Sequence, residues 1–221
     1  SLYTDLSADG TANCYLIQAA GNYKFKAVQG NTNMAVGNVK KTEVLWESFG
    51  TDVMPNVGDL IAETGYKNGY VYFSTPETFA NGNASIAVRN SKDLILWSWH
   101  IWCTDQPRLL SVRGGNGTTM HGVLDRDLGA THALKSVSEV DGLTSSDASA
   151  ALGLYYQYGR PTPFPRAKSI DVIKDDAAYG NNTFAEVIYG FKKYDQRLTW
   201  SNAVNAYATA LSFPRMFYKV G

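Results

Sequence analysis

The short segment LDRDLG places two carboxylates, Asp125 and Asp127, on either side of Arg126. If the surrounding run is a strand, both carboxylates point to the same face, because side chains alternate along a strand. Such a pair could hold calcium, which prefers oxygen ligands, or do acid–base work on a glycan. We favour an ion pair with an arginine such as Arg113 or Arg160, because the segment does not complete a calcium-loop pattern.

The other residue types that often do chemistry form no known motif. The histidines, His100, His121 and His132, lack the two-histidine helical spacing of a zinc site, and the chain has no Gly-x-Ser-x-Gly elbow. The glycine-rich run at 111–122 lacks the Gly-Lys-Ser/Thr ending of a phosphate-binding loop. We therefore predict ordinary hydrogen-bonded histidines and a mobile loop at 111–122, and no catalytic residues.

The aromatic segment LILWSWHIWCTD, at 94–105, contains three of the five tryptophans. As a strand it has an apolar face and a mixed face. The apolar face consists of Trp97, Trp99, Ile101 and Cys103, and the mixed face of Ser98, His100 and Trp102. We predict that Trp97 and Trp99 anchor a core, because large aromatic side chains bury well. Trp102 is a candidate for ligand contact, with packing an equal alternative.

Tyrosines also cluster before the motif PTPFP, where Tyr155, Tyr156 and Tyr158 are followed by Arg160. Tyrosine has a flat apolar ring and a polar tip, so this run could line a shallow groove for a sugar or a peptide. Packing is the more common role of such a run. Tyr156 and Arg160 are therefore candidate contact residues, together with Asp125 and Arg126.

The two cysteines, Cys14 and Cys103, are too far apart in the sequence for a metal knuckle or a redox pair. Both lie in strand-like runs and could meet across a sheet to form a disulfide. Two buried free thiols are an equally good interpretation, because buried cysteine behaves as a small hydrophobic residue.

The elements that position these residues are predicted from periodicity and turn signals. Strands are expected at 13–18, 23–28, 42–48, 70–75, 84–90 and 94–103. This spacing, without helical periodicity, predicts an antiparallel β-sandwich over 1–104. For residues 105–221 we expect an α+β region, with further strands at 123–130 and 181–191 and a helix at 199–211.

Composition narrows the functional classes. Hydrophobic residues make up 44% of the chain, aromatic residues 13% and charged residues 18%, which is typical of a folded β-rich protein. The formal net charge is zero and there is no basic stripe, so nucleic acid is an unexpected partner. No apolar run approaches the roughly 18 residues of a transmembrane helix, so we expect no membrane span.

Several blocks in one order carry a resemblance to a known family. They are DGTANCYLI, YKFKAVQGN, ILWSWHIWCTD, VLDRDLGA and GLYYQYGRPTPF. Together they resemble Bacteroidetes fimbrillin-associated, cell-surface adhesion proteins, and the tryptophan-rich block is the most specific. The resemblance implies an immunoglobulin-like sandwich followed by a Fibrobacter-type paralogous, C-type-lectin-like second half. It also implies an extracellular protein at the bacterial cell surface or outer membrane, whose partners are pilus subunits, glycans or host proteins.

The chain departs from this family at defined positions. Cys103 stands where valine is usual, so a Cys14–Cys103 bridge would be peculiar to this sequence. Asp127 and Tyr158 replace an asparagine and a tryptophan, and Pro161-Thr162 replaces Lys-Asp. The family's Cys-Pro-x-Gly-Trp-Arg-Val-Pro-like segment is not present, which is expected if the chain is a truncated piece or closes its second half differently.

Three functional hypotheses follow. The leading one is a non-enzymatic surface adhesion or pilus-tip protein that recognises partners through loops on a rigid scaffold. The second is a glycan-active enzyme or accessory module that uses Asp125 and Asp127. The third is a structural pilus subunit that assembles by strand exchange. No cofactor is expected, apart from the calcium option at the two aspartates.

Overall fold

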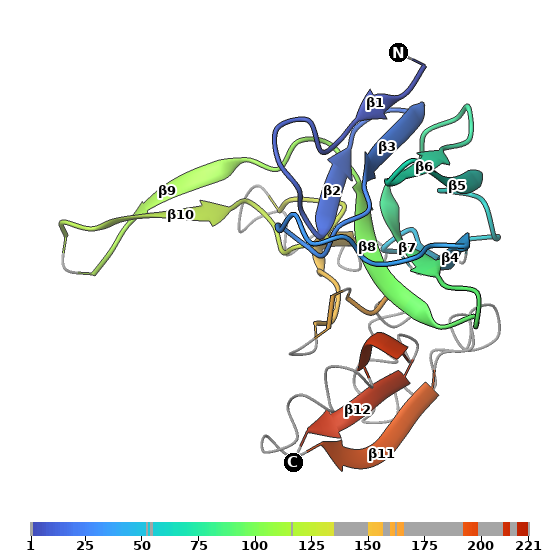
Figure 1. Cartoon of the computed structure of the whole chain (residues 1–221). Helices are drawn as coiled ribbons and strands as arrows, with labels where there is room; N and C mark the ends of the chain where they lie inside the picture. The colour runs from blue at the N-terminus through green and yellow to red at the C-terminus, as the bar shows by residue number, and fades with distance from the viewer. Residues whose placement is uncertain are drawn as a thin grey trace.

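The structure is a computed structural model of the whole chain, and it is β-rich. It describes residues 2–51, 53, 55–115, 117–134, 150–156, 160–161, 163–165, 192–198, 210–212 and 216–220. Two four-stranded sheets pack face to face, and a two-stranded hairpin extends away from them (Figure 1). All six strands predicted between 13 and 103 are present, so the β-sandwich prediction is confirmed at this level.

The first sheet has the strand order β1 (Thr4–Asp5), β3 (Asn22–Lys26), β6 (Tyr70–Ser74) and β5 (Glu63–Lys67). The second has the order β2 (Cys14–Ile17), β8 (Ile95–Cys103), β7 (Gly82–Arg89) and β4 (Lys41–Ser48). The prediction of an antiparallel sandwich is wrong in one respect. Strand β1 runs parallel to β3, and β2 runs parallel to β8, so both sheets are mixed.

Turn chemistry explains the hairpin between β5 and β6. Asn68 and Gly69 connect the two strands, and both have positive φ angles, 51° and 82°. Asn-Gly is favoured here because a two-residue hairpin turn needs this left-handed backbone at both central positions. These two residues therefore form a tight turn, and β5 is a strand that the sequence analysis did not predict.

The core lies between the two sheets and follows the period of the strands. Tyr23 and Phe25 of β3 point inward, toward Trp99 of β8, and the Phe25 and Trp99 ring centroids are 5.1 Å apart. Trp97, Ile101 and Cys103 join the same cluster. The predicted apolar face of the 94–105 segment is therefore confirmed as a core face.

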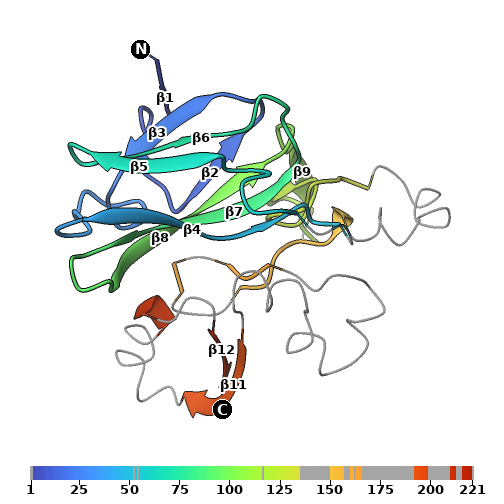
Figure 2. The same ribbon diagram turned by 90° about the vertical axis from the view of Figure 1, so that its right-hand side faces the viewer.

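The opposite face of the second sheet is buried as well. Leu45, Trp46 and Ile95 form a second cluster with Leu154 and Phe164, which come from the second half of the chain. Figure 2 shows the described part of 150–165 running beneath this sheet. Strand β7 is buried over residues 82–88 and β8 over nearly its whole length, so these two central strands are covered on both faces.

The glycine-rich run predicted as a mobile loop is instead a β-hairpin, formed by β9 (Leu109–Arg113) and β10 (Met120–Leu124). The predicted strand at 123–130 is also wrong, because β10 ends at Leu124 and a turn follows. Glycine content suggested a loop, but the glycines at 114–117 occupy only the tip of the hairpin.

The described part of the second half contains little helix. Only residues 150–151 and 210–212 are helical there, so the α+β character is not seen in these residues. Strands β11 (Lys192–Leu198) and β12 (Met216–Val220) pair in parallel. The predicted strand at 181–191, and the helix predicted at 199–211 up to residue 209, lie outside the described residues. No helix in the described ranges is long and apolar enough to cross a bilayer.

Candidate functional site

The hairpin of β9 and β10, with its connecting turn, is here called the arm. Its strands pair in an antiparallel register in which Leu109 faces Leu124 and Arg113 faces Met120. Every residue of both strands is exposed to solvent. Neither strand belongs to another sheet, so both long edges of the arm lack a strand partner within the described part of the chain.

Cross-strand partners in an antiparallel pair point to the same side, so the register assigns each residue of the arm to one of two faces. Both faces carry exposed apolar side chains. Leu110, Val112 and Val123 occupy one face together with His121. The exposed apolar side chains are Leu109, Leu110, Val112, Met120, Val123 and Leu124, with Leu109 at 72% and Met120 at 57% exposure. Monomeric proteins rarely expose contiguous apolar groups without an interaction to match them.

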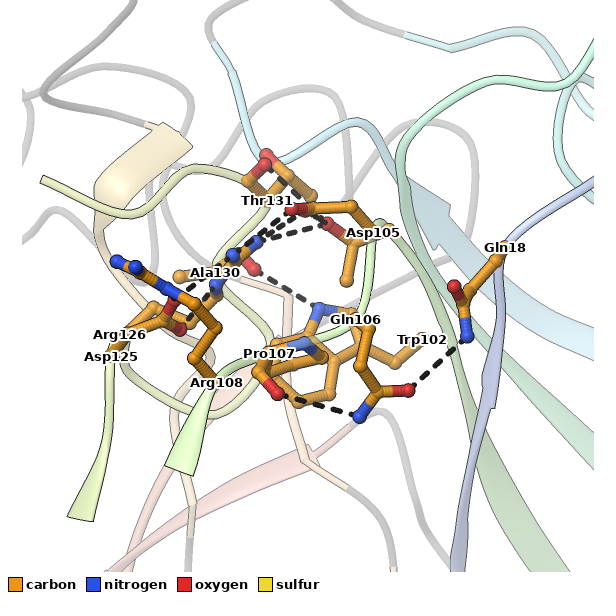
Figure 3. Close-up of polar contacts among 11 residues, drawn as sticks. Gln18, Trp102, Asp105, Gln106, Pro107, Arg108, Asp125, Arg126, Ala130 and Thr131 are labelled. Atoms are coloured by element: carbon orange, nitrogen blue, oxygen red, sulfur yellow. Dashed lines mark hydrogen bonds and ion pairs between the residues drawn. The ribbon is translucent and has the colours of Figure 1, made fainter. Parts of the chain in front are cut away.

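Four charged residues hold the base of the arm, and we call them the root cluster: Asp105, Arg108, Asp125 and Arg126 (Figure 3). Arg126 Nη1 donates to Asp105 Oδ1 at 2.6 Å, and its Nε donates to Asp125 Oδ1 at 2.9 Å. Arg108 Nε donates to Asp125 Oδ2 at 3.1 Å. The side chains of Asp125 and Arg126 are each only 4% exposed, so this pair is buried.

The ion pair predicted for Asp125 is therefore present, but with partners other than Arg113 or Arg160. Because β10 ends at Leu124, Asp125 lies opposite Arg108, and its backbone N–H donates to the Arg108 carbonyl at 2.9 Å. Asp125 therefore joins the two ends of the arm at its base, because both its backbone N–H and its carboxylate bond to Arg108. It does not share a strand face with Asp127.

Electrostatics keep the root cluster ionised. The hydrogen bond from Arg126 is the main cause that lowers the pKa of Asp125 to about 2, with Arg108 adding to it against the opposing effect of burial. Arg126 likewise lowers the pKa of Asp105, and the two carboxylates raise the pKa of the Arg126 guanidinium. A carboxylate held in this state cannot act as a general acid near neutral pH.

Trp102 lies beneath the root cluster, inside the protein. It is 4% exposed, and its Nε1–H donates to the Ala130 carbonyl at 3.1 Å. Of the two equal alternatives predicted for Trp102, ligand contact and packing, this burial agrees with packing. Residues of the second half, including Ala130 and Thr131, cover the mixed face of β8.

The two remaining predicted contact residues lie apart from the arm. The Arg160 guanidinium stacks 4.4 Å from the centroid of the Phe164 ring, and its Nη1 donates to the Ala210 carbonyl at 3.2 Å. Tyr156 is half exposed and borders an open hollow of about 500 Å³, which Asp127 and Tyr155 also line. Partial burial, together with the Cys14 thiol, raises the pKa of Tyr156.

A buried polar relay that the sequence did not reveal runs through the outer face of the second sheet. Asn83 Nδ2 donates to the Gly129 carbonyl at 2.8 Å, so its Oδ1 accepts from His100 Nε2, also at 2.8 Å. His100 Nδ1 then accepts from the Cys14 thiol at 3.1 Å. Asn83 and His100 lie on the same face of the second sheet, in neighbouring strands, but the strand predicted at 84–90 did not include Asn83.

The relay is not an activated nucleophile. Burial raises the pKa of the Cys14 thiol to about 12 and lowers the pKa of His100 to about 3, so both stay neutral. A cysteine nucleophile needs the opposite shifts, toward thiolate and imidazolium. The relay therefore serves as a satisfied hydrogen-bond network inside the sheet.

The cysteines are free thiols, so the disulfide alternative is not realised. Strand register explains this result: Cys14 pairs with His100, while Cys103 pairs with Ile17 three positions further along. Three residues along a strand span about 10 Å, beyond the roughly 7 Å limit between the Cα atoms of a disulfide. Cys103 also faces the inner core, whereas Cys14 faces His100 on the outer side.

No group of three or more histidine, cysteine, aspartate or glutamate side chains within the described ranges could hold a metal ion. Both carboxylate oxygens of Asp125 are already taken by arginines, which leaves no bare charge there for calcium.

Comparison with known proteins found no matching family model, no matching curated protein and no matching solved structure.

Proposed function

We propose that this protein is a non-enzymatic cell-surface adhesion or pilus-tip protein, and that the arm is its contact element. The observation that carries the proposal is the arm itself, which presents apolar residues on two faces and is fixed to a rigid sandwich by the root cluster. Recognition elements on rigid scaffolds are a common way to bind partners, since little ordering entropy is lost on contact.

The proposal also draws on the resemblance of the sequence blocks to Bacteroidetes fimbrillin-associated proteins. On that basis the protein is extracellular, displayed at the cell surface or outer membrane, and binds another pilus subunit, a glycan or a host protein. The immunoglobulin-like character of the sandwich and the lectin-like character of residues 105–221 belong to the same proposal. Two packed four-stranded sheets are compatible with the first of these.

A binding screen tests the proposal. The purified chain is applied to a glycan array, to host-matrix proteins and to pilus subunits of the bacterium that produces it, and every hit is remeasured by biolayer interferometry. Val112→Glu places a charge on the arm, and Val57→Glu is the matched control at an exposed valine elsewhere. We expect Val112→Glu to weaken binding at least about tenfold and Val57→Glu to leave it unchanged.

Two outcomes would contradict this function. Binding that is equally strong in both variants would show that the arm is not the contact element. A wild-type protein that binds nothing in the screen, and that is not accessible to antibodies on intact producing cells, would overturn the assignment as a surface adhesion protein.

A further inference from the structure

We propose that the arm pairs with the arm of a second copy of this chain, edge to edge through β10, to form a four-stranded intermolecular sheet. The inference rests on the proposed function in that it treats the arm as the contact element, and it names the partner. The arm extends away from the two sheets, so β10 is presented at a distance from the sandwich (Figure 1).

The hydrogen-bond phase of the arm determines which backbone groups are free for this pairing. At its two ends Asp125 N donates to the Arg108 carbonyl, and Gly114 N donates to the Thr119 carbonyl. In an antiparallel ladder, hydrogen-bonded pairs alternate with pairs whose N–H and C=O groups point outward. The outward-pointing groups of β10 therefore belong to Met120, Gly122 and Leu124.

This outward set is symmetric about Gly122, which is what a two-fold related pairing requires. If two copies of β10 meet antiparallel with Gly122 at the centre, Gly122 faces Gly122 and Met120 faces Leu124. Each of these is a hydrogen-bonded pair, so every outward N–H and C=O of β10 finds a partner. On the other face, His121 lies opposite Val123.

Charge and composition favour β10 over β9 as the paired edge. Strand β10 contains no aspartate, glutamate, lysine, arginine or proline, the residues that usually protect an edge from pairing. Strand β9 carries Arg113 among its outward residues. Pairing through β10 brings no like charges together, whereas pairing through β9 about Ser111 would place each Arg113 against an apolar Leu109.

Sheet energetics point the same way. An isolated two-stranded hairpin is marginally stable in water, and three or more strands are usually needed. Every strand residue of the arm is exposed, and the root cluster ties one end of the arm to the sandwich. Joining two arms sets Met120 against Leu124 of the other copy, whereas within one chain Met120 faces Arg113.

Sedimentation velocity on the full chain tests the pairing over about 1 µM to 1 mM protein. The wild type is expected to shift from monomer toward dimer with concentration. A double variant, Met120→Lys with Leu124→Lys, sets lysines against each other across the two-fold axis. We expect it to dimerise at least about tenfold more weakly, and the same holds for Met120→Glu with Leu124→Glu.

Mixing the two double variants is the decisive measurement. Opposite charges then face each other, so the equimolar mixture is expected to recover a heterodimer that neither variant forms alone. Val57→Lys, at an exposed valine outside the arm, is the control and is expected to behave as wild type. Unfolding midpoints close to wild type are expected for all variants, because each substituted side chain is exposed.

A wild type that stays monomeric across the range would overturn the inference, as would lysine variants that dimerise like wild type, or a mixture that fails to recover. The proposed function is judged separately, by partner binding. A monomeric wild type that still binds a surface partner refutes the pairing alone. A dimer that binds nothing, and is not displayed on cells, refutes the adhesion function alone.

Discussion

Strand β8 and the arm are neighbours in sequence and are built from similar apolar residues, yet their environments are opposite. Strand β8 is almost wholly buried, with Trp99 in the inner core and Trp102 under the second half of the chain. The arm begins a few residues later and is exposed along both strands. The difference shows that hydrophobic content alone does not place a strand. A strand is buried when other segments pack against its faces. Within the described part of the chain no other segment buries the strands of the arm.

The largest effect expected from this comparison is at Trp99, which is fully buried. Trp99→Ala should lower the free energy of unfolding by about 3–5 kcal/mol, because it removes a large side chain from a close-packed core. Leu109→Ala on the arm should change it by less than about 0.5 kcal/mol. Urea unfolding followed by circular dichroism measures both. Equal losses would mean that the arm is packed as tightly as the sandwich.

A buried carboxylate should give the next largest effect. Glu47 is fully buried, and its carboxylate accepts backbone N–H bonds from Gly58, Leu60 and Ile61 at 2.7, 2.9 and 2.7 Å. Glu47→Ala leaves these donors without their partner, and we expect a loss of about 3 kcal/mol in the same unfolding measurement. Glu63→Ala, at an exposed position of β5, is the control.

The root cluster should give a smaller, pH-dependent effect, because part of it is exposed. Arg126→Met leaves Asp125 with Arg108 alone, and we expect a loss of about 2 kcal/mol at neutral pH. The pKa of Asp125 is lowered to about 2 from 3.8, so its pairing stabilises the protein above pH 4. That contribution disappears as the pH falls from about 4 to about 2.

Arg126→Met should therefore flatten this acid-dependent part of the stability curve. The measurement is unfolding by urea at several pH values between 2 and 7, with Arg113→Met as a control whose guanidinium lies on the arm outside the root cluster. A wild-type curve with no change between pH 4 and 2 would show that Asp125 is not paired in solution.

The last prediction concerns the chemical reactivity of the two thiols rather than stability. Burial raises the pKa of Cys14 to about 12 and also raises that of Cys103, so both are protonated at pH 8. We expect almost no reaction with iodoacetamide in the native protein and full alkylation of both after denaturation without reductant. A mass of two hydrogens less, with no alkylation, would instead indicate a disulfide.

Periodicity was enough to predict the sandwich strands and the tryptophan-bearing core face. It failed for β1 and β5, because two residues at 4–5 and the polar run ETGYK carry almost no alternating signal. It also could not show that β2 and β8 run parallel, since strand direction depends on chain connections rather than on local pattern.

The site was predicted only in part. An ion pair was predicted for Asp125, but with Arg113 or Arg160, and Arg126 was predicted only as a contact residue. Arg108 and Asp105 were missed because their contacts depend on where β10 ends. For Trp102 the mixed strand face left ligand contact and packing as equal alternatives, and only the tertiary structure shows that another segment covers it. The arm was hidden by its glycines. The letters LLSVR and MHGVL on either side were the signal that could have identified it.

The parallel pairing of β2 with β8 also constrains how the protein folds. Cys14 and His100 are 86 positions apart, so the first strand of this sheet is synthesised long before its partner exists. Closing so long a segment is entropically costly, and folds rich in such contacts form slowly. Until residue 103 is available, β2 has no ladder to join. A nascent chain shorter than this cannot complete the sheet, and folding of the sandwich has to wait for its aromatic strand.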